Sequence, residues 1–308
     1  MSFNAFEYCT WFLKHLGKVM VLVVLFFVLL TAAALLSAYS PRISQDGAGT
    51  AAASLLGLAI FFFLVAMLTW SYFAAVLLEP GRVPPGWSPF ESDEEAALEA
   101  DRLESGSHRQ DKGLTGTGRP RYCRKCQAWK PERAHHDSML GRCVLRMDHY
   151  CVWVANSVGL LNYKAFLLFL FYTFLACALG ASMLLGDVAR FFKGIDIAGP
   201  ENAGRFALTM VAFVVDLAFC LSLGGLLAMH ARMVWLNYTT IEMFEKQRAA
   251  QWPYDRGPRR NFEEIFGTRF WRWWIPTYTA LEKARLLDVA LAANPRDHSL
   301  ATTEFAAL

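Results

Sequence analysis

Four long apolar segments divide this chain of 308 residues. They cover residues 19–41, 47–78, 165–186 and 206–229, and the only charged residue among them is Asp216 in the fourth. A helix needs about 20 apolar residues to cross the hydrocarbon core of a bilayer, so each segment is long enough. The first run is also too long for the apolar part of a cleaved signal peptide. The sequence therefore predicts an all-α multi-pass membrane protein with four transmembrane helices.

Basic residues orient these helices. The loops 40–49 and 187–205 are short and nearly balanced in charge. By contrast, the region between the second and third helices and the tail after His230 are rich in Lys and Arg. Under the positive-inside rule, both of these regions and the N-terminus face the cytosol. We therefore expect a cytosolic module between the second and third helices and a cytosolic C-terminal tail.

The cytosolic module has two halves of opposite charge. Residues 91–111 are acidic and rich in Glu, Ser and Gly, which is typical of a flexible linker. Residues 119–164 hold nine Lys or Arg against three acids. Such a basic surface attracts anionic lipid headgroups, although positive-inside bias explains the same excess. Residues 1–79 are expected to contain the cytosolic N-terminus and helices one and two, and 80–118 to form the flexible acidic linker. Residues 119–164 are expected to form a small cysteine-rich domain. Helices three and four then occupy 165–230, and 231–308 form the cytosolic tail.

A cluster of cysteines marks the basic half, where four of the seven cysteines of the chain fall within 29 residues. In a reducing compartment such a cluster more often binds metal or reacts than forms disulfides. Cys123, Cys126, His136 and Cys143 offer the three thiolates and one imidazole of a closed structural zinc site. The metal would supply folding free energy that a short polar segment cannot obtain from a core. Spacing alone does not choose between His136 and its neighbour His135.

Asp148, His149 and Cys151 follow the cluster and suggest a reactive cysteine. An imidazole beside a thiol can take its proton, and a carboxylate can orient that imidazole. The three residues stand shortly before Ala165, where the third helix begins. A nucleophile at the bilayer surface suits a substrate with a polar reactive end and an apolar tail, whose burial is worth about 0.8 kcal/mol per methylene. The pattern therefore favours Cys151 as a nucleophile.

A family resemblance rests on these same residues. Residues 122–166 read YCRKCQAWKPERAHHDSMLGRCVLRMDHYCVWVANSVGLLNYKAF. This segment resembles the DHHC family of protein palmitoyltransferases in its CxxCxxxKPxRxHHC opening, its MDHHCPW core and its NxxxF ending. Three more motifs occur in family order. The first, Glu79-Pro80-Gly81, resembles Asp-Pro-Gly. The second, Thr239-Thr240-Ile241-Glu242, matches Thr-Thr-x-Glu. The third, at 253–267, resembles the family's C-terminal element, with Tyr254 and Asn261 in its aromatic and Asn positions.

The resemblance implies a membrane-bound protein S-acyltransferase with its catalytic domain at 119–164. Palmitoyl-CoA is then the expected co-substrate, and the basic surface would attract its phosphates. By resemblance, Cys151 attacks the thioester and carries the acyl group, His149 acts as base and then as acid, and Asp148 orients His149. The acceptors would be cytosolic cysteines of membrane-associated proteins. Membrane lipids are expected neighbours and nucleic acid is not an expected partner. The expected location is a eukaryotic endomembrane, Golgi or endoplasmic reticulum ahead of the plasma membrane, with the catalytic domain facing the cytosol.

The resemblance also bears on the metal. Members of the family bind two zinc ions through interleaved sets of Cys and His. The first set maps to Cys123, Cys126, His136 and Cys143, and it is complete. It implies one structural Zn²⁺ and selects His136 over His135.

The second zinc set maps to positions at which every Cys and His is replaced. These positions are Asp137, Leu140, Tyr150 and Ser157, and Tyr150 turns the DHHC core into DHYC. Because a half-ligated site is costly to keep, joint replacement is physically reasonable. We expect Leu140 and Tyr150 to pack there, with Asp137 or Ser157 accepting or donating a hydrogen bond. The three residues assigned to the chemistry all remain.

Two other functions account for less of the sequence. A catalytically inactive, zinc-stabilised membrane adaptor of the same fold explains the missing ligands, but not the intact Asp148, His149 and Cys151. A small transporter is suggested only by Asp216, because an acid in a spanning helix costs several kcal/mol unless it is paired or faces water. Asp216 belongs to no motif named above, and either hydrogen bonding within the bundle or a place along an acyl cavity would accommodate it.

Overall fold

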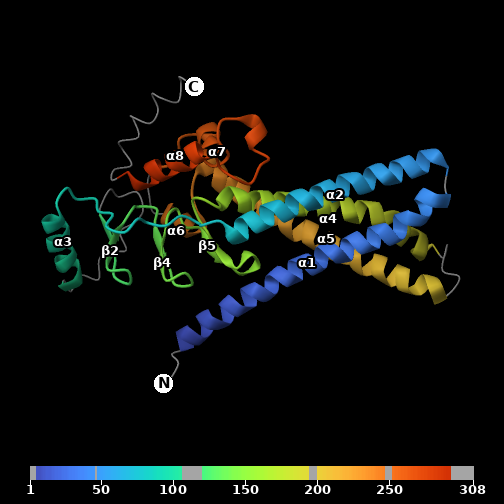
Figure 1. Cartoon of the computed structure of the whole chain (residues 1–308), viewed down its shortest axis with the longest axis horizontal. Coiled ribbons are helices and arrows are strands. Elements are labelled where there is room, and N and C mark those ends of the chain that lie inside the picture. The colour runs from blue at the N-terminus through green and yellow to red at the C-terminus, as the bar shows by residue number, and fades with distance from the viewer. Residues whose placement is uncertain (1–4, 46, 106–119, 194–199, 247–251, 293–308) are drawn as a thin grey trace. The chain divides into compact units, whose positions relative to one another are not determined.

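The computed structural model describes residues 5–45, 47–105, 120–193, 200–246 and 252–292 (Figure 1). Its helices are α1 Ala5–Gln45, α2 Ala48–Leu77, α3 Asp93–Ser105, α4 Tyr163–Phe192, α5 Pro200–Leu236, α6 Thr240–Lys246, α7 Pro258–Phe266 and α8 Ala280–Leu291, with the short 3₁₀ helices η1 Val152–Val154 and η2 Phe270–Arg272. Its strands are β1 Arg121–Cys123, β2 Ala128–Lys130, β3 His135–Asp137, β4 Arg142–Val144, β5 His149–Cys151 and β6 Asn156–Val158.

The chain divides into two compact units. The first, which we call the helical bundle, comprises Lys18–Phe73 and Phe166–His230. The second, which we call the cysteine-rich unit, comprises Met1–Gly17, Ala74–Ala165 and Ala231–Leu308. The cysteine-rich unit is thus assembled from three stretches of sequence that the membrane helices separate.

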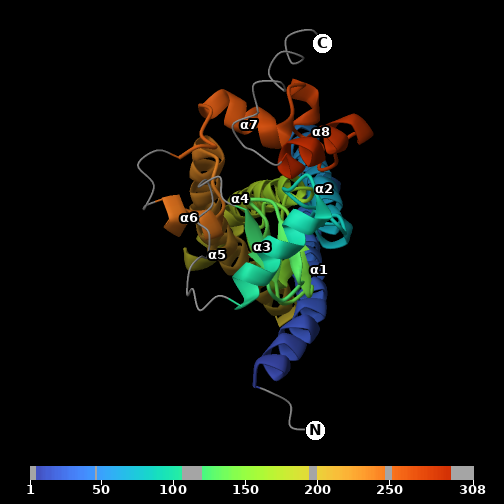
Figure 2. The same cartoon turned by 90° about the vertical axis from the view of Figure 1, so that its left-hand side faces the viewer.

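The helical bundle confirms the predicted spans. Within the described ranges, four helices are long and apolar enough to cross a membrane: Thr10–Gln45 of α1, all of α2 and α4, and Ala203–Leu236 of α5. The apolar window of α4 is 56% buried, against 28% for α2 and 17% for α1 and α5. Helix α4 is therefore the central helix, and both views place it between α2 and α5 (Figure 1, Figure 2). The outer helices expose large apolar side chains, as contact with lipid requires.

Asp216 lies inside the helical bundle and is 2% exposed. Its Oδ1 accepts a hydrogen bond of 2.9 Å from the Thr31 hydroxyl of α1. Gly180 of α4 lies so close that a Cβ there would stand 2.5 Å from Asp216 Oδ2. Helix α4 can therefore approach the acid only because position 180 has no side chain. Of the two arrangements considered for Asp216, hydrogen bonding within the bundle is the one in the structure.

In the cysteine-rich unit the described strands form three separate antiparallel pairs, β1 with β2, β3 with β4, and β5 with β6. Each strand has only three residues, so the hairpins have little backbone pairing of their own. The cysteine-rich unit also has two small apolar clusters. One joins Ala134, Leu145, Leu160 and Leu161 to apolar side chains of α8, and the other contains Met233, Tyr238, Trp252 and Tyr254.

Part of the segment expected to be a flexible linker is helical. Helix α3 begins with Asp93, Glu94 and Glu95, whose charges suit the positive end of a helix dipole. The Ser92 hydroxyl accepts the Glu95 backbone N–H and caps the first turn. The indole of Trp129, from β2, donates to the Ala96 carbonyl and fixes the helix on the cysteine-rich unit. The acidic composition suggested a solvated chain, but a cap and one aromatic contact stabilise a helix. Residues 106–119 of the expected linker lie outside the described ranges.

The motif at Glu79-Pro80-Gly81 pairs with the backbone around the site. Leu145 N–H donates to the Gly81 carbonyl and Leu161 N–H to the Pro80 carbonyl, each at 3.0 Å. Gly81 has a φ of +115°, which few residues other than glycine adopt. This pairing attaches the end of α2 to the segments before and after β5.

Candidate active site and metal centre

The four side chains predicted to bind zinc come together. The Sγ atoms of Cys123, Cys126 and Cys143 and the ring of His136 lie within 4.8 Å of one another, and they are the one such group in the described part of the chain. Cys126 Sγ stands 3.8 Å from Cys143 Sγ and 3.1 Å from His136 Nδ1. Zn–S bonds of about 2.3 Å place two sulfurs about 3.8 Å apart in a tetrahedron. The four residues therefore fit a tetrahedral Zn²⁺.

The β3–β4 hairpin explains why His136 rather than His135 joins the cluster. Successive residues of a strand point to opposite faces, so only one of two neighbouring histidines can face the cysteines. His136 is directly opposite Cys143 in the register, whereas His135 is opposite Val144. Spacing along the chain could not make this choice, but the pairing of the two strands does.

Asp148, His149 and Cys151 are also brought together, with Asp148 just before β5 and the other two at its start and end. His149 Nδ1 lies 2.6 Å from Asp148 Oδ2. Since a carboxylate can only accept, Nδ1 carries the proton of this bond and Nε2 is the nitrogen that can exchange a proton with a thiol. The imidazole also hydrogen-bonds Cys151. The site thus has a thiol, an imidazole and a carboxylate in the order that nucleophilic catalysis requires.

The electrostatic setting of His149 favours its protonated form. Burial alone lowers the pKa of the imidazole, but the hydrogen bonds with Asp148 and Cys151 outweigh it and raise the pKa to about 9. At neutral pH the ring is therefore an imidazolium beside the sulfur. A cation in that position stabilises a thiolate, which is the nucleophilic form of cysteine.

Thr240 holds the carboxylate of this relay. Its backbone N–H donates to Asp148 Oδ1 at 2.8 Å, and its hydroxyl donates to Asp148 Oδ2 at 3.0 Å. Asp148 is 2% exposed, so these donors replace the water that its charge would otherwise need. The Thr-Thr-x-Glu motif thus contacts the site directly through its second threonine.

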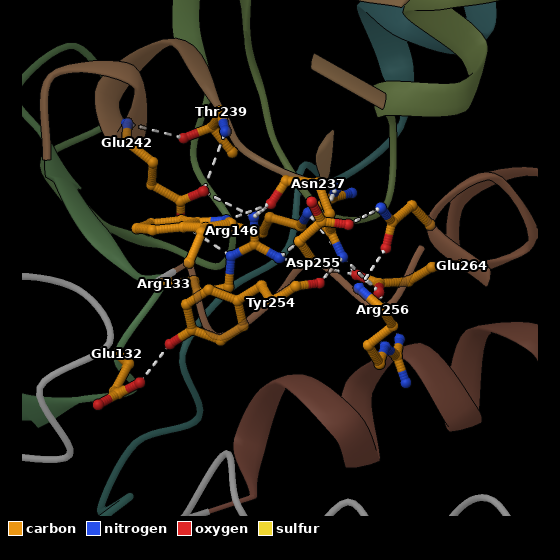
Figure 3. A network of polar contacts seen from close by, with 12 residues as sticks. Glu132, Arg133, Arg146, Asn237, Thr239, Glu242, Tyr254, Asp255, Arg256 and Glu264 are labelled. Atoms are coloured by element: carbon orange, nitrogen blue, oxygen red, sulfur yellow. Dashed lines mark hydrogen bonds and ion pairs between the residues drawn. The ribbon is translucent and has the colours of Figure 1, made fainter. Parts of the chain in front are cut away.

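Glu242 of the same motif forms a buried ion pair. Both of its carboxylate oxygens accept from the Arg133 guanidinium, at 2.8 and 2.6 Å, in the two-pronged geometry that makes such pairs strong. Glu242 Oε2 also accepts the Thr239 N–H, and the Thr239 hydroxyl accepts the Glu242 N–H (Figure 3). Arg133 comes from the loop before β3, so this pair ties the start of α6 to the zinc-binding segment.

Asn237 extends this network toward the C-terminal element. Its side-chain oxygen accepts from Arg133 at 3.0 Å and from Arg146 at 2.9 Å. Its amide nitrogen donates to the Tyr254 carbonyl and to Glu264, both at 2.9 Å (Figure 3). Burial raises the pKa of Glu264, but the nearby arginines outweigh it and hold the pKa below its usual value. One asparagine therefore connects two arginines to a buried carboxylate.

The C-terminal element closes the network. Asn261 in α7 donates to the Trp235 carbonyl at 2.7 Å and to Asp255 at 2.8 Å, and its oxygen accepts the Arg256 N–H. The Tyr254 hydroxyl donates to Glu132, and the Tyr254 ring lies 4.5 Å from the Arg133 guanidinium carbon. Tyr254 and Asn261 thus shape the framework around the site.

Two of the positions that correspond to the family's second zinc set are joined by a hydrogen bond. The Ser157 hydroxyl donates to Asp137 Oδ2, and Asp137 Oδ1 accepts the Met139 N–H at 2.7 Å. Leu140 and Tyr150 are half-buried. The expectation that Asp137 or Ser157 would form a hydrogen bond there is met by the two residues bonding to each other.

Comparison with known proteins identifies the family. A model described as "DHHC palmitoyltransferase" matches residues 116–247. Two Arabidopsis thaliana proteins named "Probable protein S-acyltransferase 14" and "Probable protein S-acyltransferase 13" are 47% and 44% identical, over 94% and 93% of this chain and 93% of each relative. The chain belongs to the DHHC palmitoyltransferase family. A Xenopus laevis protein named "Palmitoyltransferase ZDHHC15" is 36% identical over 61% of this chain and 55% of its own length.

The sequence interpretation missed three residues of the hydrogen-bond network around the site: Arg146, Asn237 and Glu264. Each is an ordinary polar residue when the chain is read locally, and none occupies a motif position named above. Asn237 has a φ of +51°, in the left-handed region that asparagine tolerates better than most residues. Its position two residues before the Thr-Thr-x-Glu motif was the one available signal.

Proposed function

We propose that this protein transfers a fatty acyl group from acyl-CoA, with palmitoyl-CoA as the donor, to cysteines of membrane-associated proteins through an acyl-Cys151 intermediate. The observation that carries the proposal is the relay of Asp148, His149 and Cys151 in a chain with apolar membrane spans. The names of the relatives support the same reaction class. Asp148, His149 and Cys151 are the proposed catalytic residues.

In the first half-reaction, the Cys151 thiolate attacks the thioester carbonyl carbon of acyl-CoA. A new C–S bond forms to Cys151 and the C–S bond to coenzyme A breaks. The departing thiolate takes the proton of the His149 imidazolium, leaving a neutral ring. Asp148 keeps that ring in one tautomer and orientation throughout.

In the second half-reaction, neutral His149 removes the proton from an acceptor cysteine. The acceptor thiolate attacks the acyl-Cys151 carbonyl, and the Cys151 thiolate leaves beside the regenerated imidazolium. One thioester is exchanged for another in each step, so neither step requires ATP. The order of events gives ping-pong kinetics.

Zinc has a structural place in this proposal. Cys123, Cys126, His136 and Cys143 would hold one Zn²⁺, and the closed set of four protein ligands leaves no position for substrate. The ion would fix the β1–β2 and β3–β4 hairpins, which are too short to be stable alone.

We further propose that the cysteine-rich unit faces the cytosol of a Golgi or endoplasmic reticulum membrane. Support comes from the excess of Lys and Arg in 119–164 and after His230, together with the reduced cysteines that metal binding requires. A cytosolic site can reach both coenzyme A esters and cytosolic cysteines of membrane-associated proteins.

Labelled palmitoyl-CoA tests the proposed function. Purified full-length protein is expected to take up a hydroxylamine-labile label, and Cys151→Ser is expected to remove it. Cys220→Ser, which changes a cysteine of α5, serves as the matched control and should keep the label. Absence of label on the intact protein would instead favour the inactive membrane adaptor, which retains the zinc cluster and the fold.

A further inference from the structure

The two hairpins that carry the chemistry meet at one side-chain bond. The β3–β4 hairpin contributes His136 and Cys143 to the zinc cluster, and we call it the zinc hairpin. The β5–β6 pair carries Cys151, and we call it the catalytic hairpin. The Ser157 hydroxyl of the catalytic hairpin donates to the Asp137 carboxylate of the zinc hairpin.

Both partners of this bond are shielded from water. Ser157 is 0% exposed and Asp137 is 2% exposed. The second oxygen of Asp137 accepts the Met139 N–H, so the carboxylate has a donor at each oxygen. Loss of the serine hydroxyl would leave a buried carboxylate oxygen without its partner, and such a loss is far more disruptive than one at the surface.

The strand register places this bond beside both functional groups. Asp137 follows the zinc-cluster residue His136 directly in β3. Ser157 stands opposite Tyr150, and the next pair along the catalytic hairpin is Cys151 with Asn156. One end of the bond, Asp137, is therefore next to the zinc-cluster residue His136. The other end, Ser157, pairs with the residue next to Cys151.

Other hydrogen bonds of the catalytic hairpin reach α6 and α2. Asp148, just before it, is held by Thr240, and Asn156 donates to three carbonyls at the end of α2. Those contacts attach the hairpin to α6 and α2, but not to the zinc hairpin. The bond between Ser157 and Asp137 joins the side chains of the two hairpins directly.

We propose that Asp137 and Ser157 are positioning residues that transmit the rigidity of the zinc hairpin to Cys151 through a metal-free link. This inference rests on the proposed acyl transfer, since it assigns these residues a role in that reaction. Attack on a carbonyl carbon requires a well-defined distance and angle. A small displacement of the nucleophile therefore slows the reaction strongly, even when the substrate binds equally well. The link should therefore affect the acylation rate constant and leave acyl-CoA binding almost unchanged.

A double-mutant cycle in the full-length protein tests the link. Acylation of Cys151 is followed with labelled palmitoyl-CoA in Ser157→Ala, Asp137→Ala and the double variant. Each single variant is expected to lower the maximal rate by about tenfold or more, with KM for palmitoyl-CoA within about twofold. The double variant should be no slower than the slower single variant, because the same bond is lost in all three. Additive losses would overturn the proposal.

Three further measurements separate positioning from general damage. Asp137→Asn keeps an acceptor for Met139 and can donate to Ser157, so it should restore most of the rate. Zinc content and the absorption spectrum of the Co²⁺-substituted protein should match wild type in every variant. Ser138→Ala, in the turn of the zinc hairpin, removes an exposed bond from Lys125 of the β1–β2 turn and should have no effect. Failure of Asp137→Asn to restore the rate, or loss of zinc from Ser157→Ala, would contradict the link.

Hydrogen exchange of backbone amides tests the link without a measurement of activity. In Ser157→Ala the backbone amides of 148–158 should exchange faster, while those of 121–130 should keep wild-type rates. If wild-type protein takes up no label, the proposed acyl transfer fails, and exchange alone decides whether the link exists. Unchanged exchange in 148–158 would overturn the link even in an active enzyme.

Discussion

Asp148 accepts two hydrogen bonds from Thr240, a residue 92 positions further along the chain, one from its backbone N–H and one from its hydroxyl. With the imidazole of His149 as a third donor, the buried carboxylate is fully engaged. Two helices of the membrane bundle separate these residues in sequence. The orientation of the proposed catalytic base therefore depends on a segment that follows the last membrane helix.

Thr240→Val should weaken this support. Valine has nearly the shape of threonine but no hydroxyl, so Asp148 Oδ2 loses one of its donors while the backbone bond remains. We expect a loss of about 1.5–3 kcal/mol in stability, as for hydrogen bonds to charged groups. Acylation of Cys151 should slow by about tenfold, which corresponds to a rise of about 1.4 kcal/mol in the activation free energy. Thermal unfolding and single-turnover labelling measure the two effects. Thr240→Ser keeps the hydroxyl, and it should behave like wild type.

The pH profile should depend on His149. Its pKa in the folded protein is about 9, above the ordinary value of 6.5, because Asp148 and Cys151 outweigh burial. A raised pKa means that the imidazolium form contributes stability in full below pH 6.5 and loses it as the pH rises through 9. The acylation rate should likewise fall as the pH rises through 9, since neutral His149 cannot protonate the leaving coenzyme A thiolate.

Asp148→Asn provides the comparison for this profile. Without the carboxylate, burial lowers the pKa of His149 unopposed by its main partner. The alkaline fall in rate should move to lower pH by at least about one unit. Rates measured from pH 6 to 10 in both proteins would reveal the shift, and superimposable profiles would exclude His149 as the titrating group.

Purified protein should contain one zinc ion per chain. The four clustered ligands fit one tetrahedral ion, and the described residues hold no second such group. Cys143→Ser should abolish tight zinc binding and unfold the short hairpins, since structural zinc contributes about 10–16 kcal/mol in comparable peptides. Elemental analysis and circular dichroism measure these outcomes. Two tightly bound zinc ions per chain would show that Asp137 and its neighbours bind metal after all.

Arg133→Met should be strongly destabilising. It leaves Glu242, which is 0% exposed, without its guanidinium partner. Removal of one member of a buried ion pair costs about 3–5 kcal/mol. Arg259→Met breaks a comparable pair with Glu263 at a side chain that is 91% exposed, and it should cost less than about 1 kcal/mol. Chemical denaturation of the two variants makes the comparison. Adding Glu242→Gln to Arg133→Met should recover part of the loss, because the buried charge is then gone.

Gly17→Leu should disturb the active site from the first helix. Gly17 is buried, and a Cβ there would stand 3.0 Å from Ala155 Cβ and 3.5 Å from the Tyr150 hydroxyl. A larger side chain must push α1 away from the turn after Cys151, and overpacking of this kind costs about 1–3 kcal/mol. We expect slower acylation with zinc content unchanged. Gly49→Leu meets nothing within 4 Å and is the matched control. Equal rates in both variants would show that the contact is unimportant.

The chain's local patterns determined the membrane spans and the candidate chemistry. Each apolar run is read within one helix, and the order Asp148, His149, x, Cys151 is read within four consecutive residues. The composition of the zinc site could also be proposed from spacing, although the choice of His136 needed either the family resemblance or the pairing of β3 with β4. In each case the information lies within a few residues, where chain geometry fixes how side chains can meet.

The contacts that hold the site were decided only by the tertiary structure. Thr240 reaches Asp148, Glu242 reaches Arg133 across 109 positions, and Ser157 reaches Asp137 across 20. Helix α3 was also missed, because its contact with Trp129 depends on how separate segments pack. Hydrogen bonds are short and directional, so a pair forms only where the whole fold brings donor and acceptor together. Hydropathy and spacing describe single segments, so they do not show which groups far apart in the sequence come into contact.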